Sequence, residues 1–408
     1  MTDYEAAKII DEICEISKDE TGAITRFPFT EPWMRAQMYL KELFEKFGFD
    51  TFFDCAGNLH GRIGPVGDTV MTGSHVDTVR NGGKYDGLYG VVGSALAVSR
   101  LYKKHGTPTV AIEVIAFSEE EGTCFPFNFW GSKAVVGDVD WETVKYLKDK
   151  DGISMAKALE DSGFSYSQNC AKRDDIKAFV ELHIEQGGVL ETKDMEVGVV
   201  TSIVGYKKFN VEIYGEANHA GTTPMPYRKD AGFSAAQIIA QLIKRAKEYG
   251  EPQVLTVGQI EFKPNLSNVV PGYSRFSLDM RHTDAQILNR FQAEALEIIK
   301  EITAEDKTTF NFQEIFDDPP IPMDDKIMNI ILETCEDKGA KHMKIHSGAG
   351  HDSQIMSRIA PVGMIFVPSK DGVSHNPKEF TTPAGLEKGA EILEEVLYKL
   401  AYKSVWTQ

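Results

Sequence analysis

The order of apolar and polar residues predicts most of the framework of this chain. Near-continuous apolar runs, typical of strands covered on both faces of a sheet, occur at 109–117, 178–184 and 362–367. Shorter strand-like runs lie at 50–54, 59–63 and 69–73. Helical spacing of apolar residues predicts a helix at 31–47 and a buried helix at 88–104. Because helices and strands alternate, we expect an α/β fold with three layers, α/β/α.

The pattern changes in the middle of the chain. Residues 209–217 alternate apolar and polar positions, which indicates a half-exposed strand. Further elements are predicted at about 231–248 (helix), 254–262 and 273–281 (strands), 284–303 (helix) and 309–316 (strand). This βαββαβ order predicts a small α+β, ferredoxin-like domain. We therefore expect a discontinuous larger domain, 1–205 and 319–408, with residues 206–318 inserted into it.

Composition limits the classes of partner. The chain has 408 residues, 42% of them hydrophobic, and a formal net charge of −17. That charge makes nucleic acid and anionic membranes poor partners, and an anionic substrate would need a local arginine or metal ion. Five scattered cysteines, an odd number, favour reduced thiols over a disulfide framework. With no apolar stretch of 18 residues and no signal-peptide pattern at the start, we expect a cytoplasmic protein.

Histidines and acidic residues follow the buried strands. His75 comes after the strand-like run at 69–73, and His183 ends the run at 178–184. Three consecutive glutamates follow the run at 109–117, and His375 follows the run at 362–367. Asp86 precedes the predicted helix at 88–104. Because sites in open α/β sheets form at the carboxyl ends of strands, we expect these side chains to share one crevice.

This set of side chains suits a two-metal site. Three histidines and two carboxylates fit a pair of Zn²⁺, Mn²⁺ or Co²⁺ ions bridged by one carboxylate. Such a pair polarises a carbonyl and lowers the pKa of a bridging water, and a further carboxylate must accept the proton. Glu119, Glu120 and Glu121 can supply both a ligand and that base. Asp77 is placed to accept the ring N–H of His75.

Each of these residues alone also has a structural interpretation. A single histidine is more often structural than a ligand, Asp86 could cap a helix, and a glutamate run is usually a solvated face. Cys124, close to the glutamates, is a weaker candidate as a thiol nucleophile. The motifs HExxH, GxSxG and the P-loop are absent. The shared position after buried strands is what favours the metal site.

Eight motifs in order resemble the M20-type metal-dependent amidohydrolases from about residue 20 to 400. They are GSHVDTV…YDG, EEEG, ELHIEQG, NHAGTTPM, NVVPG, RHTD, SGAGHD and SHNP. The chain looks most like the branch of allantoate amidohydrolases and N-carbamoyl-L-amino-acid hydrolases. FPFNFWGSK at 125–133 and PSKDGVSHNP at 368–377 look most like the allantoate enzymes. One departure is Cys124, in EEEGTCF, where relatives commonly read EEEGSRF.

The resemblance implies two divalent ions per subunit, Mn²⁺ or Zn²⁺. The implied ligands are His75, Asp86, Glu121, His183 and His375. His75 and His183 would hold one ion, Glu121 and His375 the other, and Asp86 would bridge them. Glu120 would be the general base, and Asp77, as the partner of His75, is also expected among the catalytic residues. A shifted register, with Glu119 as base and Glu120 as ligand, remains the alternative.

The resemblance also implies substrate-binding residues. They are Gln186, His219, Asn268, Arg281 and Gly350. His219 would stabilise the oxyanion and reach a neighbouring subunit's site, and Asn268 and Arg281 would bind the substrate carboxylate. The plain alternatives are a Gly/Pro turn for NHAGTTP and a surface ion pair for Arg281.

The implied activity is hydrolysis of the ureido group of allantoate, which releases ammonia and carbon dioxide and leaves a ureidoglycine-type product. The inserted domain would act as a lid and pair across a homodimer. Three alternatives remain: an N-carbamoyl-L-amino-acid hydrolase, an M20 peptidase acting on a dipeptide, and a metal-free binding or scaffold protein of the same fold.

Overall fold

The structure, a computed structural model, describes residues 5–403. The chain folds into two compact units, one of Met1–Thr201 with Met323–Gln408 and one of Ser202–Pro322. The predicted boundaries at 206 and 318 lie a few residues inside the second unit. The reason is that strand β6, Val197–Ile203, is followed almost at once by β7, Gly205–Tyr214. The apolar pattern therefore has no gap that would mark the change of unit.

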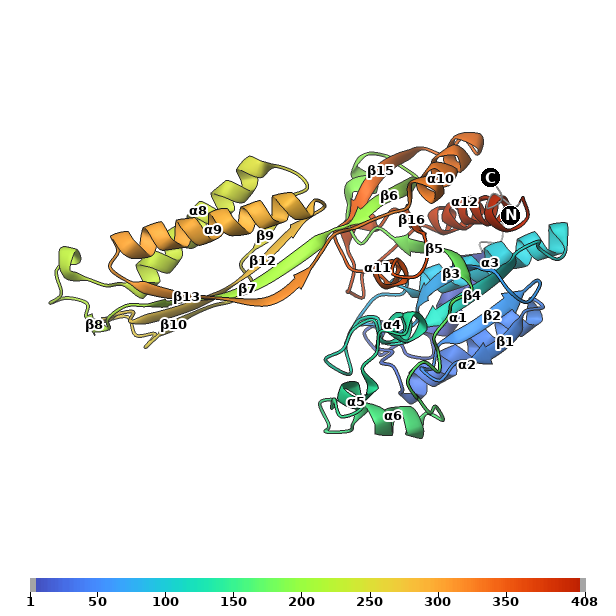
Figure 1. The fold of residues 1–408 in the computed structure, drawn as a ribbon, viewed down its shortest axis with the longest axis horizontal. Coiled ribbons are helices and arrows are strands. Elements are labelled where there is room, and N and C mark those ends of the chain that lie inside the picture. The colour runs from blue at the N-terminus through green and yellow to red at the C-terminus, as the bar shows by residue number, and fades with distance from the viewer. Residues whose placement is uncertain (1–4, 404–408) are drawn as a thin grey trace. The chain divides into compact units, whose positions relative to one another are not determined.

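The larger unit is built on a mixed sheet that has nine strands within the described residues (Figure 1). Besides β6, its strands are β1 (Asp50–Phe53), β2 (Leu59–Ile63), β3 (Thr69–His75), β4 (Ala111–Phe117), β5 (Ile176–Ile184), β14 (Ile321–Pro322), β15 (His342–Ser347) and β16 (Val362–Val367). Their order is β1-β2-β4-β3-β5-β16-β6-β14, with β15 paired to β6. The four central strands β4, β3, β5 and β16 are mutually parallel. Their carboxyl ends therefore meet at one edge of the sheet.

Helices cover both faces of this sheet. On one face lie α1 (Glu5–Cys14), α2 (Glu31–Lys46), α3 (Leu88–His105), α10 (Asp325–Asp337) and α12 (Pro383–Ala401). On the other face lie α4 (Trp130–Val136) and α11 (Asp352–Met356). The short helices α5 (Trp141–Val144) and α6 (Met155–Asp161) pack with α4 in a second apolar cluster. The predicted α/β class is confirmed. The remaining short helix of this unit is α7 (Val189–Thr192), which contacts the 3₁₀ turn at Lys370–Gly372.

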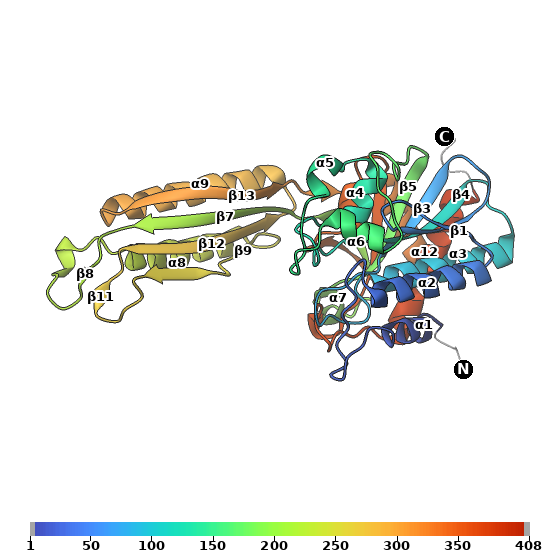
Figure 2. The same ribbon diagram turned by 90° about the horizontal axis from the view of Figure 1, so that it is seen from below.

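The smaller unit has its own antiparallel sheet, covered on one face by α8 and α9 (Figure 1 and Figure 2). Its elements besides β7 are α8 (Ala231–Tyr249), β9 (Val254–Thr256), β10 (Ile260–Lys263), β12 (Tyr273–His282), α9 (Ala285–Glu305) and β13 (Thr309–Asp318). The strand order β10-β12-β7-β13, with β9 also on β12, follows the predicted βαββαβ pattern. Asp230 and Asp284 begin the two helices by accepting hydrogen bonds from first-turn amides.

The predicted strand at 254–262 is broken in two. Three residues, 257–259, face only two residues of β12, because Thr256 pairs with Asp279 and Ile260 pairs with Phe276. The extra residue interrupts the ladder as a bulge does. A separate two-stranded ribbon joins β8 (Asn218–His219) to β11 (Val269–Val270). The 3₁₀ turn Met225–Tyr227 follows β8.

The expectation of reduced cysteines is wrong for two of the five. Cys55 and Cys170 form a disulfide with their Cα atoms 6.2 Å apart, although 115 residues separate them in sequence. Cys14, Cys124 and Cys335 are free thiols. Spacing along the chain carried no sign of this pair, because the fold alone brings the two segments together. Of the helices within residues 5–403, none combines the length and apolar character needed to cross a bilayer.

A buried ionic network joins strands β2 and β4 to the segments that contain Asp54 and Arg173. His60 on β2 lies between two carboxylates, with Nδ1 2.7 Å from Glu113 Oε1 and Nε2 3.3 Å from Asp54 Oδ2. Arg173 also donates two hydrogen bonds to Glu113. Burial acts to lower the pKa of His60, but the hydrogen bonds to Asp54 and Glu113 outweigh it and raise the pKa to about 9.

This network predicts a loss of stability in mild alkali. Because the folded pKa of His60 lies above its usual value of 6.5, its stabilising charge is complete below pH 6.5 and is lost as pH rises through about 9. We expect the unfolding free energy of chelator-treated protein, measured in urea, to fall by on the order of 2–3 kcal/mol across that window. His60→Gln should flatten this part of the profile. An unchanged slope in the variant would contradict the assignment.

Candidate active site

The four central parallel strands deliver the predicted site residues to one edge of the sheet. His75 is the last residue of β3 and pairs with Phe117, the last residue of β4. His183 lies near the end of β5 and pairs with Phe366 of β16. The glutamates and His375 lie on the loops that follow β4 and β16. This parallel pairing explains why residues far apart in sequence lie close together.

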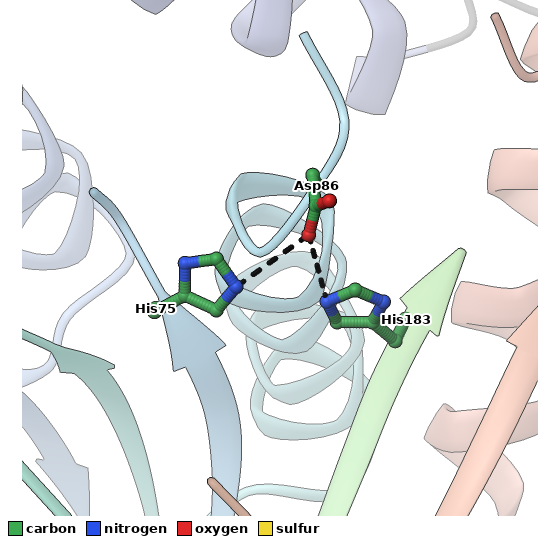
Figure 3. Close-up of side chains that lie close together, drawn as sticks. All are labelled: His75, Asp86 and His183. Atoms are coloured by element: carbon green, nitrogen blue, oxygen red, sulfur yellow. Dashed lines mark ion pairs between the residues drawn. The ribbon is translucent and has the colours of Figure 1, made fainter. Parts of the chain in front are cut away.

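Asp86 stands at the centre of the cluster. Its Oδ1 lies 3.5 Å from His75 Nε2 and 3.3 Å from His183 Nε2, as Figure 3 shows. Its Oδ2 faces the other way and lies 3.1 Å from His375 Nε2, which is 3.2 Å from Glu121 Oε1. One carboxylate therefore offers one oxygen to each of two sets of side chains. It does not cap α3, because Gly87 is the N-cap residue and no side chain caps that helix.

Gly87 makes this arrangement possible. Its φ is +66°, a conformation that favours glycine, and a Cβ there would lie 2.4 Å from the His75 ring. The chain can thus turn from Asp86 directly into α3 while the imidazole lies against the backbone.

The histidine tautomers fit metal ions. His75 Nδ1 lies 3.1 Å from the main-chain oxygen of Asp77, and His183 Nδ1 lies 2.9 Å from that of Ile184. A neutral imidazole that donates through Nδ1 presents a lone pair at Nε2. Both Nε2 atoms face Asp86 Oδ1, and His183 Nε2 also accepts a 3.2 Å hydrogen bond from Gly87 N; neutral rings so placed require a cation beside that carboxylate oxygen.

The spacing of the ligand atoms agrees with that requirement. Ligand atoms around a tetrahedral ion bound at 2.0–2.1 Å lie about 3.4 Å apart. The atoms around Asp86 are 3.1–3.5 Å from their neighbours. The sets His75–Asp86–His183 and Asp86–Glu121–His375 each converge within 4.8 Å. Without metal, hydrogen bonds to Asp86 and Glu121 raise the pKa of His375 to about 11, so protons would hold the places that metal ions take.

A further buried group of possible ligands is already satisfied. Glu181, His183 and His351 also converge. Both oxygens of Glu181 accept hydrogen bonds, one from Ser74 Oγ at 2.8 Å and the other from the amide and hydroxyl of Ser353 at 2.9 and 2.6 Å. His351 Nε2 lies 2.7 Å from Ser347 Oγ. These contacts give Glu181 and His351 a structural role.

The three glutamates have different surroundings. Glu119, with φ +52°, turns back into its own loop, where Oε1 accepts hydrogen bonds from the amides of Cys124 and Phe125 at 3.0 and 2.9 Å. Glu120 Oε2 lies 3.9 Å from His75 Nε2, and Glu121 faces His375. Burial, reinforced by the neighbouring carboxylates, raises the pKa of Glu120 well above its usual value. The shifted register that uses Glu119 as base has no support in these contacts.

The expected contact of Asp77 differs from the observed one. The His75 ring meets the main-chain oxygen of Asp77, whereas the nearest carboxylate oxygen is 3.8 Å away. The carboxylate is turned toward the amides of Glu120 and Glu121, from which it accepts hydrogen bonds of 3.2 and 3.1 Å. Asp77 therefore fixes the acidic loop as well as the position of His75.

Gln186 lies against the same centre. Its Nε2 donates to Asp86 Oδ2 at 2.8 Å, and its backbone has φ +59°. Its buried Oε1 has no hydrogen-bond partner among the residues that the structure describes. Gln186 thus combines a contact with Asp86 and a free acceptor.

His219 and Asn268 lie together in the smaller unit, where β8 and β11 pair. The main-chain oxygen of Asn268 accepts a 3.0 Å hydrogen bond from Ala220 N. His219 is exposed, and its Nδ1 accepts hydrogen bonds from the amides of Gly221 and Thr222 at 3.0 and 3.2 Å. Since Nδ1 accepts, the ring proton is on Nε2, which is left as a donor.

Arg281 lies on β12, in the five-stranded sheet of the smaller unit, at the end away from the β8–β11 ribbon. In the pairing of β12 with β7, Arg281 lies opposite Tyr206. Tyr273, at the end of β12 near the β8–β11 ribbon, lies opposite Tyr214. Eight residues of strand separate Arg281 from Tyr273, which is about 26 Å. Within one copy the structure therefore does not bring Arg281 to Asn268. The guanidinium binds Asp279 through Nε at 2.8 Å and Nη2 at 3.2 Å.

The loop around Gly350 connects β15 to α11. Gly350 is exposed, whereas His351 and Asp352 are buried. Cys124 is no candidate nucleophile, because burial and the neighbouring Glu119 raise the pKa of its thiol strongly.

Three residues that support the site were not found from the sequence. Arg26 is fully buried and donates through Nε to the main-chain oxygen of Val76 at 2.6 Å. Ser374 contacts the side chain of Asp86, and Glu379 accepts a hydrogen bond from the Asp86 amide. Ser374 and Glu379 flank His375 within SHNPKE, yet no spacing rule identifies them, because their contacts depend on the fold of two loops.

Residues 71–399 match the protein family described as peptidase family M20/M25/M40. The chain belongs to this family. The resemblance read from the motifs is thereby confirmed. Two similar relatives within the family's amidohydrolases are allantoate amidohydrolases, from Bacillus subtilis (40% identity over 98% of this chain and 97% of the relative) and Escherichia coli (41% over 94% and 95%).

Other M20-type relatives bear different names. N-carbamoyl-L-amino acid amidohydrolase of Geobacillus stearothermophilus is 37% identical over 96% of both chains. Among solved structures, an amidase of the hydantoinase/carbamoylase family from Burkholderia multivorans has a TM-score of 0.91 at 31% identity and covers 96% of each chain.

The placement of the glutamates predicts which one moves the proton. Glu120→Gln should retain bound metal and lower turnover by about 10²–10⁴-fold, because the amide cannot accept a proton. Glu119→Gln is the matched control, and it should retain most turnover because its amide oxygen can still accept from the loop. Metal content by atomic emission and ammonia release check both variants. Full turnover in Glu120→Gln would refute Glu120 as the general base. Loss of metal from this variant would instead favour Glu120 as a metal ligand.

Proposed function

We propose that this M20 family member is an allantoate amidohydrolase, a hydrolase of ureido C–N bonds. The observation that carries the chemistry is the placement of the Asp86 carboxylate between two converging sets of histidine and glutamate ligands. The substrate assignment is supported by two allantoate amidohydrolases of about 40% identity that match nearly the whole chain.

The metal centre follows from the two ligand sets. His75 and His183 would hold one divalent ion, Glu121 and His375 the other, with Asp86 shared; Mn²⁺ and Zn²⁺ both suit these ligands. When bound, such ions polarise the ureido carbonyl and lower the pKa of the attacking water.

The protein's own groups then move the protons. Glu120 takes a proton on its carboxylate from the attacking water and passes it to the leaving nitrogen. Asp77 keeps Glu120 in place through the two loop amides. The bond between the ureido carbon and that nitrogen breaks, which leaves a ureidoglycine-type amine and carbamate. Carbamate decomposes to ammonia and carbon dioxide.

Several groups would orient the substrate. Nε2–H of His219 would donate to the developing oxyanion, since its Nδ1 is fixed as an acceptor. The free Oε1 of Gln186 would accept from the ureido amide, and the backbone at Gly350 would complete the pocket. Asn268 and Arg281 would bind the carboxylate, for which a guanidinium offers a planar fork.

The geometry of the smaller unit favours a homodimer. His219 and Asn268 lie on the β8–β11 ribbon, next to the Tyr273 end of β12, whereas Arg281 lies about 26 Å along β12 from Tyr273, too far for one small substrate to contact all three in one copy. We infer that a second copy supplies His219 and Asn268 while Arg281 acts within its own chain. In this arrangement the smaller unit serves as both lid and dimerisation domain. We further infer a cytoplasmic enzyme, and hydrolysis of allantoate would place it in purine nitrogen recovery.

The decisive experiment measures ammonia release by Mn²⁺-loaded protein with allantoate and a panel of N-carbamoyl-L-amino acids in parallel. We expect the highest kcat/KM with allantoate. A preference for a carbamoyl amino acid would leave the proposed site intact and overturn the assignment of allantoate as substrate. If the metal-loaded protein hydrolyses none of the ureido compounds, the assignment as a ureido hydrolase is overturned.

Arg281 gives a test of carboxylate binding. Arg281→Lys should raise KM for allantoate by roughly 10-fold with a smaller change in kcat, because the fork that binds two oxygens is lost. Arg275→Lys is the control, since Arg275 lies on the same face of β12 six residues away. Steady-state kinetics compare the two. If Arg281→Lys and Arg275→Lys have equal KM values, Arg281 does not bind the substrate carboxylate, and its contacts within the sheet, such as the ion pair with Asp279, are structural.

A further inference from the structure

A buried carboxylate that is not among the proposed metal ligands contacts the backbone of the segment that carries Asp86. Glu379, four residues after His375, is only 4% exposed. Its Oε1 accepts hydrogen bonds from the amides of Tyr85 at 2.7 Å and Asp86 at 3.2 Å. Its Oε2 accepts one from Ser374 Oγ at 2.8 Å. Both oxygens of Glu379 are therefore committed to two loops, the one that carries Asp86 and the one that carries His375.

The loop before Asp86 is shaped around this carboxylate. A Cβ added at Gly83 would lie 2.3 Å from the carboxyl group of Glu379, so the backbone passes closer than any side chain would permit. The close approach is what lets one side chain accept both amides at once.

Ser374 extends the connection to the side chain of Asp86. Its Oγ lies 2.8 Å from Asp86 Oδ2 as well as from Glu379 Oε2, so its single proton is shared between the two carboxylates. Oδ2 is the oxygen that faces His375. Ser374 directly precedes His375, whose φ of +54° is unusual for a histidine. Such a conformation is maintained only when surrounding contacts fix the backbone, and here they come from the segment that carries Tyr85 and Asp86.

The two ligand sets differ in how firmly they are held. His75 and His183 belong to central strands, and their positions are fixed by the hydrogen bonds of the sheet. His375 lies on a loop, and its side chain is 46% exposed. The first set therefore depends on loop contacts only through the shared Asp86, whereas Asp86, Glu121 and His375 of the second set all lie on loops.

We propose that Glu379 and Ser374 are positioning residues that join the Asp86 and His375 loops and selectively maintain the metal site formed by Asp86, Glu121 and His375. The proposal rests on the two-metal function proposed above. Groups that orient metal ligands typically change metal affinity by about 10–100-fold when removed. We expect that loss at the site that contains His375, and a much smaller change at the site that shares only Asp86 with it.

The test is a Mn²⁺ titration of chelator-stripped, full-length protein by calorimetry, so no substrate enters the readout. The unaltered protein should bind two ions. Glu379→Ala and Ser374→Ala should each weaken the site that contains His375 by about 10–100-fold and change the other, which shares only Asp86, much less. Glu379→Gln should restore much of the affinity, because its amide oxygen still accepts from the loop amides and its NH₂ can donate to Ser374. A merely structural role would not produce loss at a single site with rescue by glutamine.

Two further variants make the result specific. Glu185→Gln is the matched control: Glu185 is also buried and accepts two amide hydrogen bonds, from Val189 and Leu190, but neither belongs to a proposed ligand loop. It should bind both ions normally. In a Glu379→Ala/His375→Ala double variant, the losses should not add, because both changes affect the same site.

Unchanged affinities in Glu379→Ala and Ser374→Ala, or equal weakening of both sites, would overturn the proposal. If Glu379→Ala does not fold, Ser374→Ala decides alone, since it removes one hydroxyl. If the unaltered protein binds fewer than two ions, the two-metal function itself fails. Normal titrations with no allantoate turnover would instead leave this inference intact and remove only the substrate assignment.

Discussion

The Asp86 carboxylate, held among three imidazole nitrogens, is the interaction on which the rest of the site depends. Three histidine Nε2 atoms approach its two oxygens at 3.1–3.5 Å, and two of those rings direct their Nδ1 atoms at main-chain oxygens. Such a convergence is stable when metal ions, or protons on the rings in their absence, lie between the nitrogens and the carboxylate. The parallel centre of the sheet makes the convergence possible, because β3, β4, β5 and β16 all end at the same edge.

Buried carboxylates around this centre fall into two groups. Asp86, Glu120 and Glu121 face the space between the histidines. Asp77, Glu119, Glu181 and Glu379 instead accept hydrogen bonds from backbone amides or serines and hold the loops. A buried carboxylate is costly unless it is hydrogen-bonded, so these contacts offset part of that cost while they hold the first group in place. The sequence cannot separate these groups, because Glu119, Glu120 and Glu121 are adjacent and chemically identical.

The features predicted from sequence are those that follow from periodicity. The runs at 109–117, 178–184 and 362–367 correspond to β4, β5 and β16, because a strand covered on both faces must be apolar throughout. The helices α2, α3, α8 and α9 were also predicted, since each is long and periodic. From strand ends alone, the converging histidines and glutamates could be anticipated.

What could not be predicted depends on contacts between distant segments. The Cys55–Cys170 disulfide, the turn of the Asp77 carboxylate toward two amides, and the support from Glu379 all arise from loops meeting in space. The separation of Asn268 from Arg281 follows from strand register, which a single sequence does not specify. The bulge at 257–259 broke a strand whose apolar pattern is nearly continuous.

The proposed bridging of two metal ions by the Asp86 carboxylate can be examined by electron paramagnetic resonance of the protein loaded with two equivalents of Mn²⁺. Two ions sharing Asp86 should give the spectrum of an exchange-coupled pair, and Asp86→Asn should abolish that coupling. A spectrum of isolated, uncoupled Mn²⁺ at full loading would contradict the account, because the two sets of ligands would then hold their ions independently.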